Sequence, residues 1–257
     1  MILKVENVKK FFGGITAINN ASFKIQANKI TALIGPNGAG KTTIFNIISG
    51  LIKPDAGQIF FKNKNITHLS PYKRFNMGIS RTFQDIKLFE SLSTNDNFLI
   101  GKKNRKGEKI YEIFFNFAKE KQKELEELMK IKQLLGLNEK LELSQNINQL
   151  SYGIQKLVAI GRALMSNPEL LMVDEPTSGL DEKSLSKIIN AIKAIKETGV
   201  TIVIVEHNIR LIKEIADWII FFHQGEVVKE GTFEEVIKSQ QLSEIYFGKK
   251  LQEGYLK

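Results

Sequence analysis

The feature that most constrains the fold of this chain is the octapeptide Gly-Pro-Asn-Gly-Ala-Gly-Lys-Thr at residues 35–42. It matches the phosphate-loop pattern G-x-x-x-x-G-K-[ST], whose backbone N–H groups surround phosphate oxygens at the start of a helix. An apolar run at 30–34 precedes it and a helix-like stretch at 43–48 follows it. This context argues against a glycine-rich turn that binds nothing, and it predicts an α/β fold that binds a nucleotide.

The residues of this loop have separate expected roles. Lys41 is expected to reach the β- and γ-phosphates, and the hydroxyl of Thr42 is expected to bind Mg²⁺. The rest of the loop and the next residue are expected to line the phosphates, namely Gly35, Pro36, Asn37, Gly38, Ala39, Gly40 and Thr43.

An acidic pair in the second half of the chain favours ATP or GTP hydrolysis. Asp174 and Glu175 follow the apolar strand-like run 170–173, and ligands bind at the carboxyl ends of strands in α/β sheets. Asp174 is suited to hold Mg²⁺ through a water, and Glu175 to orient and deprotonate an attacking water. Such a pair alone usually marks a solvated loop, but together with a phosphate loop the catalytic interpretation is preferred.

Further motifs resemble those of ATP-binding cassette (ABC) ATPases. Residues 150–155, Leu-Ser-Tyr-Gly-Ile-Gln, resemble the signature motif commonly written L-S-G-G-Q. Ser-Gly-Leu-Asp, ending at Asp181, resembles the D-loop, and His207 after an apolar strand resembles the switch histidine. Gln84 resembles the Q-loop glutamine, and Phe12 the aromatic residue that stacks on adenine. These motifs occur in the family's order and span nearly the whole chain.

The resemblance implies ATP and Mg²⁺ as cofactors and a composite site. Ser151 and Gly153 would contact ATP held by a second ATP-binding subunit, identical or different, so the chain would dimerise. Gln84 would ligate Mg²⁺, His207 would contact the γ-phosphate, and Asp181 would lie at the nucleotide.

Two signature positions depart from the family pattern, and several residues have simpler interpretations. Tyr152 replaces the first signature glycine, and Ile154 replaces the usual glutamine. Ser151 and Gly153 carry the main contacts, so activity is expected to be retained. Ser151 is also a favoured helix N-cap, His207 alone could be an ordinary strand-end residue, and Phe12 could pack in the core.

The chain is expected to form one ABC ATP-binding domain over residues 1–257. The core and an antiparallel β-subdomain would use about 1–85 and 167–240, with a mainly parallel core sheet. A helical subdomain with the signature would cover about 86–166, where residues 109–135 show helical periodicity. Residues 241–257 would form a C-terminal tail.

Composition excludes several other classes of function. The chain has no cysteine, which excludes disulfides, thiol catalysis and thiolate metal sites. It shows no signal-like segment and no apolar stretch of transmembrane length, so it is expected neither to span a membrane nor to be secreted. The family resemblance implies a peripheral position at the cytoplasmic face of the membrane. The net charge of +9 is scattered apart from a basic cluster at 102–106, interpreted as an exposed loop. Without an aromatic stacking platform, nucleic-acid binding is not expected.

The resemblance extends to one subfamily of ABC ATPases. It rests on the residues at 81–84, 175–176 and 205–207, on the signature tyrosine and on the long helical insertion. This subfamily contains the larger ATP-binding subunits of branched-chain amino-acid importers. The chain would then energise import by ATP-driven dimer closure, with permease subunits and, indirectly, a substrate-binding protein as partners. Import of urea or short amides, lipopolysaccharide export and a non-transport ABC ATPase remain alternatives. A phosphate-loop kinase would lack the signature and Glu175.

One apolar segment is expected to face the permease. Residues 85–101 follow Gln84 and include Phe89, and in the resembling family this stretch borders a groove that receives a short permease helix. Packing within the helical subdomain is the simpler interpretation for most of these residues.

Overall fold

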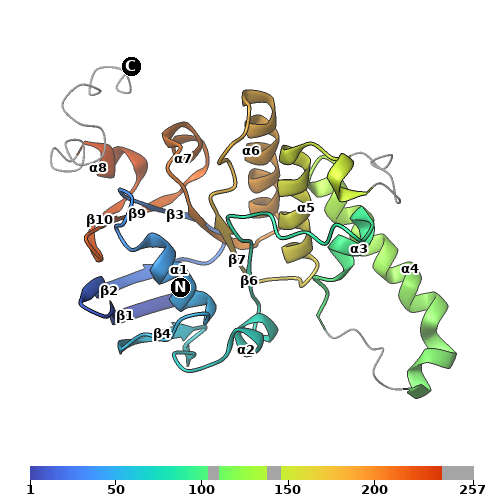
Figure 1. The fold of residues 1–257 in the computed structure, drawn as a ribbon, viewed down its shortest axis with the longest axis horizontal. Helices are drawn as coiled ribbons and strands as arrows, with labels where there is room; N and C mark the ends of the chain where they lie inside the picture. Colours follow the sequence, from blue (N-terminus) through green and yellow to red (C-terminus); the bar gives the residue numbers. More distant parts are fainter. Residues whose placement is uncertain (104–109, 138–145, 239–257) are drawn as a thin grey trace. The chain divides into compact units, whose positions relative to one another are not determined.

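A computed structural model describes residues 1–103, 110–137 and 146–238 of the chain (Figure 1). The chain divides into two compact units: Met1–Arg74 with Thr201–Lys257, called the first unit, and Phe75–Val200, called the second unit. The predicted tail at 241–257 and the end of the basic cluster at 104–106 lie outside the described residues.

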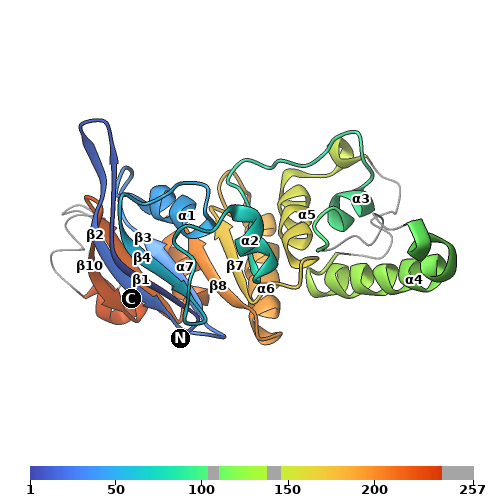
Figure 2. The ribbon, with the colours of Figure 1, turned by 90° about the horizontal axis from the view of Figure 1, so that it is seen from below.

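The first unit contains an antiparallel sheet with strand order β2-β1-β4-β5 (Figure 2). Its strands are β1 (Leu3–Phe12), β2 (Ile15–Ile25), β4 (Ala56–Phe61) and β5 (Lys64–Asn65). Leu3, Val5 and Val8 of β1 are buried and alternate with more exposed residues, which places one face of the sheet on a core. The predicted antiparallel β-subdomain is therefore present.

The first unit also contains a parallel group of strands. The strand β3 (Ile30–Ile34) lies between β8 (Thr201–Val205) and β9 (Trp218–His223) and runs parallel to both. Every residue of β3 and β8 is buried, as expected for parallel strands covered on both faces. The strand β10 (Glu226–Gly231) pairs antiparallel with β9. The predicted mainly parallel core is confirmed.

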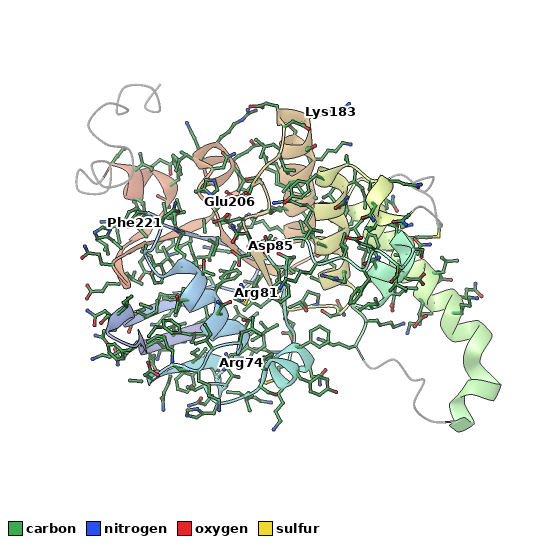
Figure 3. All side chains as sticks on the ribbon, viewed as in Figure 1. Arg74, Arg81, Asp85, Lys183, Glu206 and Phe221 are labelled. Carbon is green, nitrogen blue, oxygen red and sulfur yellow. The ribbon has the colours of Figure 1, made fainter. Side chains whose placement is uncertain are left out.

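The helices of the first unit are α1 (Lys41–Ser49), α7 (Ile209–Ile215) and α8 (Phe233–Ile237), and α2 (Pro71–Asn76) crosses the boundary between the units. The C-terminal end of α1 is held by a buried arginine of α2, Arg74, which is 1% exposed (Figure 3). Its Nη1 donates to the carbonyls of Ile47 and Ile48 at 2.6 and 2.7 Å. Its Nη2 donates to Thr67 O and its Nε to Leu69 O. Burial lowers the pKa of Arg74 to about 10, so it stays charged at neutral pH.

The second unit pairs two strands with a group of helices. The strands β6 (Ile79–Arg81) and β7 (Leu170–Asp174) run parallel, with Arg81 opposite Met172. The helices are α3 (Thr94–Leu99), α4 (Ile110–Leu134), the short 3₁₀ helix η1 (Ile147–Gln149), α5 (Tyr152–Leu164) and α6 (Glu182–Glu197). The predicted helical stretch around residues 109–135 corresponds to α4.

Close packing of α3 on α5 depends on one glycine. A Cβ atom at Gly161 would lie 2.0 Å from Cε1 of Phe98, which is fully buried. Any side chain at this position would separate the two helices, and the signature-bearing helix α5 would shift with them.

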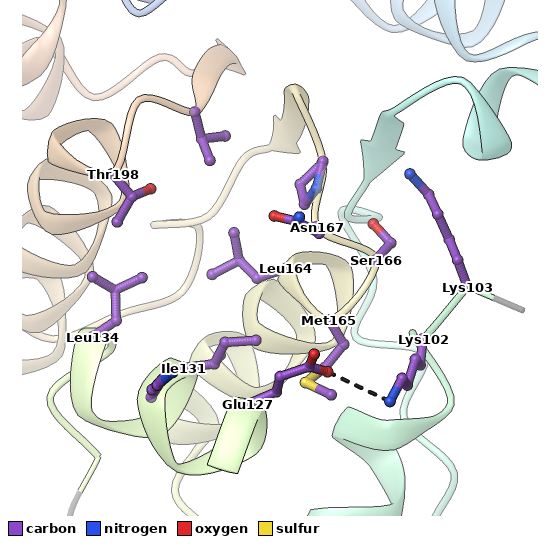
Figure 4. Close-up of a pocket in the computed structure, with 13 residues that line it drawn as sticks. Lys102, Lys103, Glu127, Ile131, Leu134, Leu164, Met165, Ser166, Asn167 and Thr198 are labelled. Carbon is purple, nitrogen blue, oxygen red and sulfur yellow. Dashed lines mark ion pairs between the residues drawn. The ribbon is translucent and has the colours of Figure 1, made fainter. Parts of the chain in front are cut away.

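A cavity of about 580 Å³ opens between the ends of α4, α5 and α6 (Figure 4). Ile131, Leu134 and Leu164 line it, and Lys102 forms an ion pair with Glu127 at 3.5 Å on its edge. No residue predicted for nucleotide binding lines this cavity. Within the described residues, no helix is long and apolar enough to cross a membrane.

Candidate active site

The phosphate loop of the first unit has the backbone shape that its sequence predicts. Gly35, Gly38 and Gly40 have φ angles of 149°, 78° and 100°, a region that favours glycine. A Cβ at Gly35 would lie 2.1 Å from the carbonyl oxygen of Phe222, whereas nothing lies within 4 Å of the same position at Gly38. The loop is therefore closely packed at its start and open at its middle.

The N-terminus of α1 suits a phosphate group. Gly40 is its N-cap, no side chain caps the helix, and no acidic residue lies in its first turn. Lys41 is 8% exposed, and its Nζ donates to the carbonyls of Gly35 and Pro36 at 2.7 and 2.9 Å. The ammonium group is thus held inside the curve of the loop, where phosphate oxygens can replace the carbonyl oxygens as acceptors. The loop fits a nucleotide phosphate.

The predicted switch histidine lies at the start of α7 in the first unit. His207 is exposed, and its backbone N–H donates to Oε2 of Glu206 at 2.9 Å. The same oxygen accepts from the N–H of Asn208, whose own side chain caps α7 by accepting from Leu211. Glu206 is fully buried (Figure 3). This carboxylate fixes the turn on which His207 sits.

The acidic pair of the second unit is held by the segment that starts at Arg81. Arg81 Nη2 forms an ion pair with Oδ2 of Asp174 at 2.8 Å, and the two side chains are 9% and 3% exposed. Gln84 Nε2 donates to Oε2 of Glu175 at 2.8 Å. The predicted Q-loop glutamine therefore contacts the predicted general base. Burial lowers the pKa of Arg81, and the charge and hydrogen bond of Asp174 oppose this shift.

The backbone at Glu175 adopts a conformation that is rare for a non-glycine residue. Its φ is 42°, in the left-handed region, which typically costs about 1–3 kcal/mol and persists only where neighbours hold it. The carbonyl of Glu175 accepts from Nζ of Lys156 at 2.9 Å. Lys156 is buried on α5, and its Nζ lies 5.2 Å from the ring centroid of Tyr152. The signature helix thus helps to fix the glutamate.

The signature and the D-loop meet within the second unit. Ser151 is the N-cap of α5 and is exposed, with no hydrogen bond from its side chain to the helix. Gly153 packs against α6, where a Cβ would lie 2.7 Å from Ser184. Asp181 caps α6 by accepting from the N–H of Ser184 at 2.8 Å, and this bond lowers the pKa of Asp181. Tyr152 is 46% exposed and lies beside Gly179.

Two predicted ligand residues lie on exposed positions of the first unit. Phe12 ends β1 and is 47% exposed, so it is not a core residue. The ammonium group of Lys10 lies 5.4 Å from its ring centroid. Thr42 is exposed in the first turn of α1, and Thr43 beside it is half-buried. The hydroxyl of Thr42 and the carboxylate of Asp174 are oxygen ligands of the kind that Mg²⁺ prefers, with waters completing its shell.

Residues 18–178 match the ABC transporter family. The chain belongs to this family. It is 34% identical to a probable branched-chain amino acid transport ATP-binding protein, LivG, from Methanocaldococcus jannaschii. The alignment covers 96% of this chain and 97% of that protein. An ATP-binding cassette of an ABC transporter superposes with a TM-score of 0.83 at 32% identity, covering 95% of this chain and 98% of that one. A dimeric cassette bound to ADP and Pi superposes with a TM-score of 0.75 at 28% identity, covering 90% and 99%.

The ABC family membership makes the protein an ATPase and confirms the predicted ABC ATPase fold. Three residues of this ATPase were not assigned a role from the sequence: Arg81, Lys156 and Glu206. Arg81 lies inside the quoted Q-loop context, but no local pattern indicates that it reaches Asp174, 93 positions away. The partner of Arg81 depends on the pairing of β6 with β7.

Proposed function

We propose that this ABC ATPase energises an importer for branched-chain amino acids from the cytoplasmic face of the membrane. It works with permease subunits and, through them, with a substrate-binding protein. The observation that carries the proposal is the end-to-end similarity to transport ATP-binding proteins named for these substrates, at 34% and 31% identity. Residues 1–257 work as one ATP-binding domain, with the core and β-subdomain at about 1–85 and 167–240 and the signature subdomain at about 86–166.

ATP binds with its phosphates on the backbone N–H groups of the loop at 35–42. Lys41 exchanges its two carbonyl acceptors for phosphate oxygens. The hydroxyl of Thr42, the amide oxygen of Gln84 and, through a water, Asp174 would hold Mg²⁺, which would neutralise phosphate charge. Phe12 stacks on adenine, for which its exposed ring is available.

Hydrolysis depends on positioning and on charge stabilisation. Glu175 orients the attacking water and accepts its proton, and His207 contacts the γ-phosphate. A second ATP-binding subunit supplies its own Ser151 and Gly153 to the same nucleotide, with Asp181 nearby. The exposed, uncapped start of α5 leaves N–H groups available for this anion. Closing and opening of this dimer drives the permease.

The segment after Gln84 is the docking surface for the permease. Phe89 is 49% exposed although it is large and apolar. The backbone around it is fixed by Asn97, which is fully buried: its Oδ1 accepts from Phe89 N, and its Nδ2 donates to the carbonyls of Phe89 and Ser93. A rigid backbone that presents an exposed aromatic ring suits helix-in-groove docking.

The test is uptake of labelled substrates by cells that lack the gene and carry it on a plasmid. Wild-type protein is expected to restore leucine uptake and to co-purify with membrane subunits after detergent extraction. Glu175→Gln protein should co-purify equally well but fail to restore uptake. Restored uptake of urea or short amides without leucine uptake would contradict the substrate class. Absence of any membrane subunit in the purified material would favour a non-transport ATPase.

A further inference from the structure

The ion pair between Arg81 and Asp174 is built into the strand pairing of the second unit. Both residues end parallel neighbours, β6 and β7. The N–H of Thr82 donates to Met172 O at 2.9 Å, and the N–H of Asp174 donates to Oγ1 of Thr82 at 3.2 Å. The backbone on both sides of the ion pair is therefore fixed. The contact between the guanidinium and the carboxylate can therefore change through side-chain movement alone.

The carboxylate of Asp174 is the group that the proposed function assigns to Mg²⁺, and a cation already lies against it. The pair is nearly excluded from solvent, so water screens the two charges poorly. The 2.8 Å contact joins Nη2 of Arg81 to Oδ2 of Asp174. A dication held at the same carboxylate is attracted by Asp174 and repelled by the buried guanidinium.

The neighbouring contact of the same segment has no such effect. Gln84 donates an uncharged amide to Glu175, so it orients that carboxylate without adding charge. Residues 81–84 therefore hold both acidic residues, one with a cation and one with a neutral group. The contact of Arg81 brings a positive charge to its carboxylate, whereas the contact of Gln84 does not.

We propose that Arg81 sets the Mg²⁺ affinity of the ATPase by competing with the metal for the Asp174 carboxylate. It is a positioning and tuning residue that does not touch the nucleotide. In the absence of metal it supplies a positive charge to this buried carboxylate. When the metal binds, the guanidinium yields part of its interaction with Oδ2. The inference rests on the proposed function of Asp174 as a Mg²⁺ ligand.

The test measures the Mg²⁺ concentration that half-saturates binding of a fluorescent ADP to the full chain, so it does not depend on turnover. In Arg81→Gln this concentration is expected to fall about fivefold or more, because a positive charge near the metal is gone. Arg81→Lys keeps the charge and should stay within about twofold of wild type. In an Asp174→Asn background, Arg81→Gln should change the value much less, because the carboxylate for which the two cations compete is gone. An unchanged or higher half-saturating concentration in Arg81→Gln overturns the proposal.

A measurement on the wild-type chain keeps the test decisive if Arg81→Gln does not fold. In protein labelled with ¹⁵N-arginine, the Arg81 side-chain signal is identified by its loss in Arg81→Lys. Addition of Mg²⁺ to the ADP-bound chain should shift this signal, whereas ADP with a chelator should not. A signal unchanged by Mg²⁺ overturns the competition while leaving nucleotide binding intact. Failure of the wild-type chain to bind ADP at all would overturn the proposed function as well.

Discussion

Replacing Gly153 by alanine should destabilise the second unit through a specific clash with α6. The added Cβ would lie 2.7 Å from both Cβ and Oγ of Ser184. Ordinary carbon contacts are about 3.5–4.0 Å, so α5 and α6 must separate locally by about 1 Å. Overpacking of this kind costs about 1–3 kcal/mol, and alanine's helix preference over glycine returns about 0.5–1 kcal/mol. We therefore expect a net loss in the free energy of unfolding near the middle of the range of about 0–2.5 kcal/mol that these figures allow.

The assay is urea unfolding monitored by far-UV circular dichroism. It compares the urea midpoints of the variants, provided that the slope of the unfolding free energy against urea concentration is unchanged. Gly14→Ala is the matched control, because nothing lies within 4 Å of a Cβ there. The decisive variant combines Gly153→Ala with Ser184→Gly, which removes the clashing atoms. The loss in the free energy of unfolding of this double variant should be about 1–2 kcal/mol smaller than the sum of the losses in the two single variants. Strict additivity would refute the reasoning, because the cost of Gly153→Ala would then not come from Ser184.

Three further predictions test other parts of the account. Arg74→Met should lower the free energy of unfolding by about 2–4 kcal/mol, because it leaves carbonyls of α1 and of the loop before α2 without their donor. Lys73→Met, at the exposed neighbouring position, should be nearly neutral in the same urea assay. The Ser151→Arg protein should bind ATP as a monomer but not hydrolyse it. Mixing it with Lys41→Ala protein should restore part of the activity, since one composite site per mixed dimer is intact. No recovery of activity after subunit exchange would argue against the composite site. Phe89→Asp should keep the basal ATPase activity of the isolated subunit and lose co-purification with the permease and leucine uptake, whereas normal uptake would place the docking surface elsewhere.

The parts of the fold that the sequence predicted are those fixed by local patterns. The phosphate loop at 35–42 and the largely apolar strands at 30–34 and 170–173 were identified because each pattern needs only neighbouring residues. The strands of the first hairpin, β1 and β2, are 10 and 11 residues long, and the sequence pattern does not show their full length. Register shifts between Val5, Val8 and Lys10 interrupt the polar–apolar alternation that would have indicated the full length.

Contacts that decide the chemistry of the acidic pair were outside the reach of sequence reasoning. Arg81 and Lys156 are charged residues, a type that is mostly solvent-exposed in folded proteins. Each is instead turned inward by its element, Arg81 by the register of β6 on β7 and Lys156 by the face of α5 that meets Glu175. Which buried group a long cation reaches depends on tertiary packing, which no local spacing encodes.

The central claim is that the chain hydrolyses ATP with Glu175 as the base in a site completed by a second subunit. The most direct measurement is the molar mass of Glu175→Gln by light scattering with ATP and Mg²⁺, together with its turnover. The substitution keeps the shape of the side chain and an oxygen that can accept the hydrogen bond from Gln84. We expect an ATP-dependent dimer and a turnover reduced by about 10²–10⁴, while Glu169→Gln, an exposed glutamate before β7, hydrolyses ATP normally. A Glu175→Gln protein that stays monomeric with ATP and turns over at the wild-type rate would contradict the account.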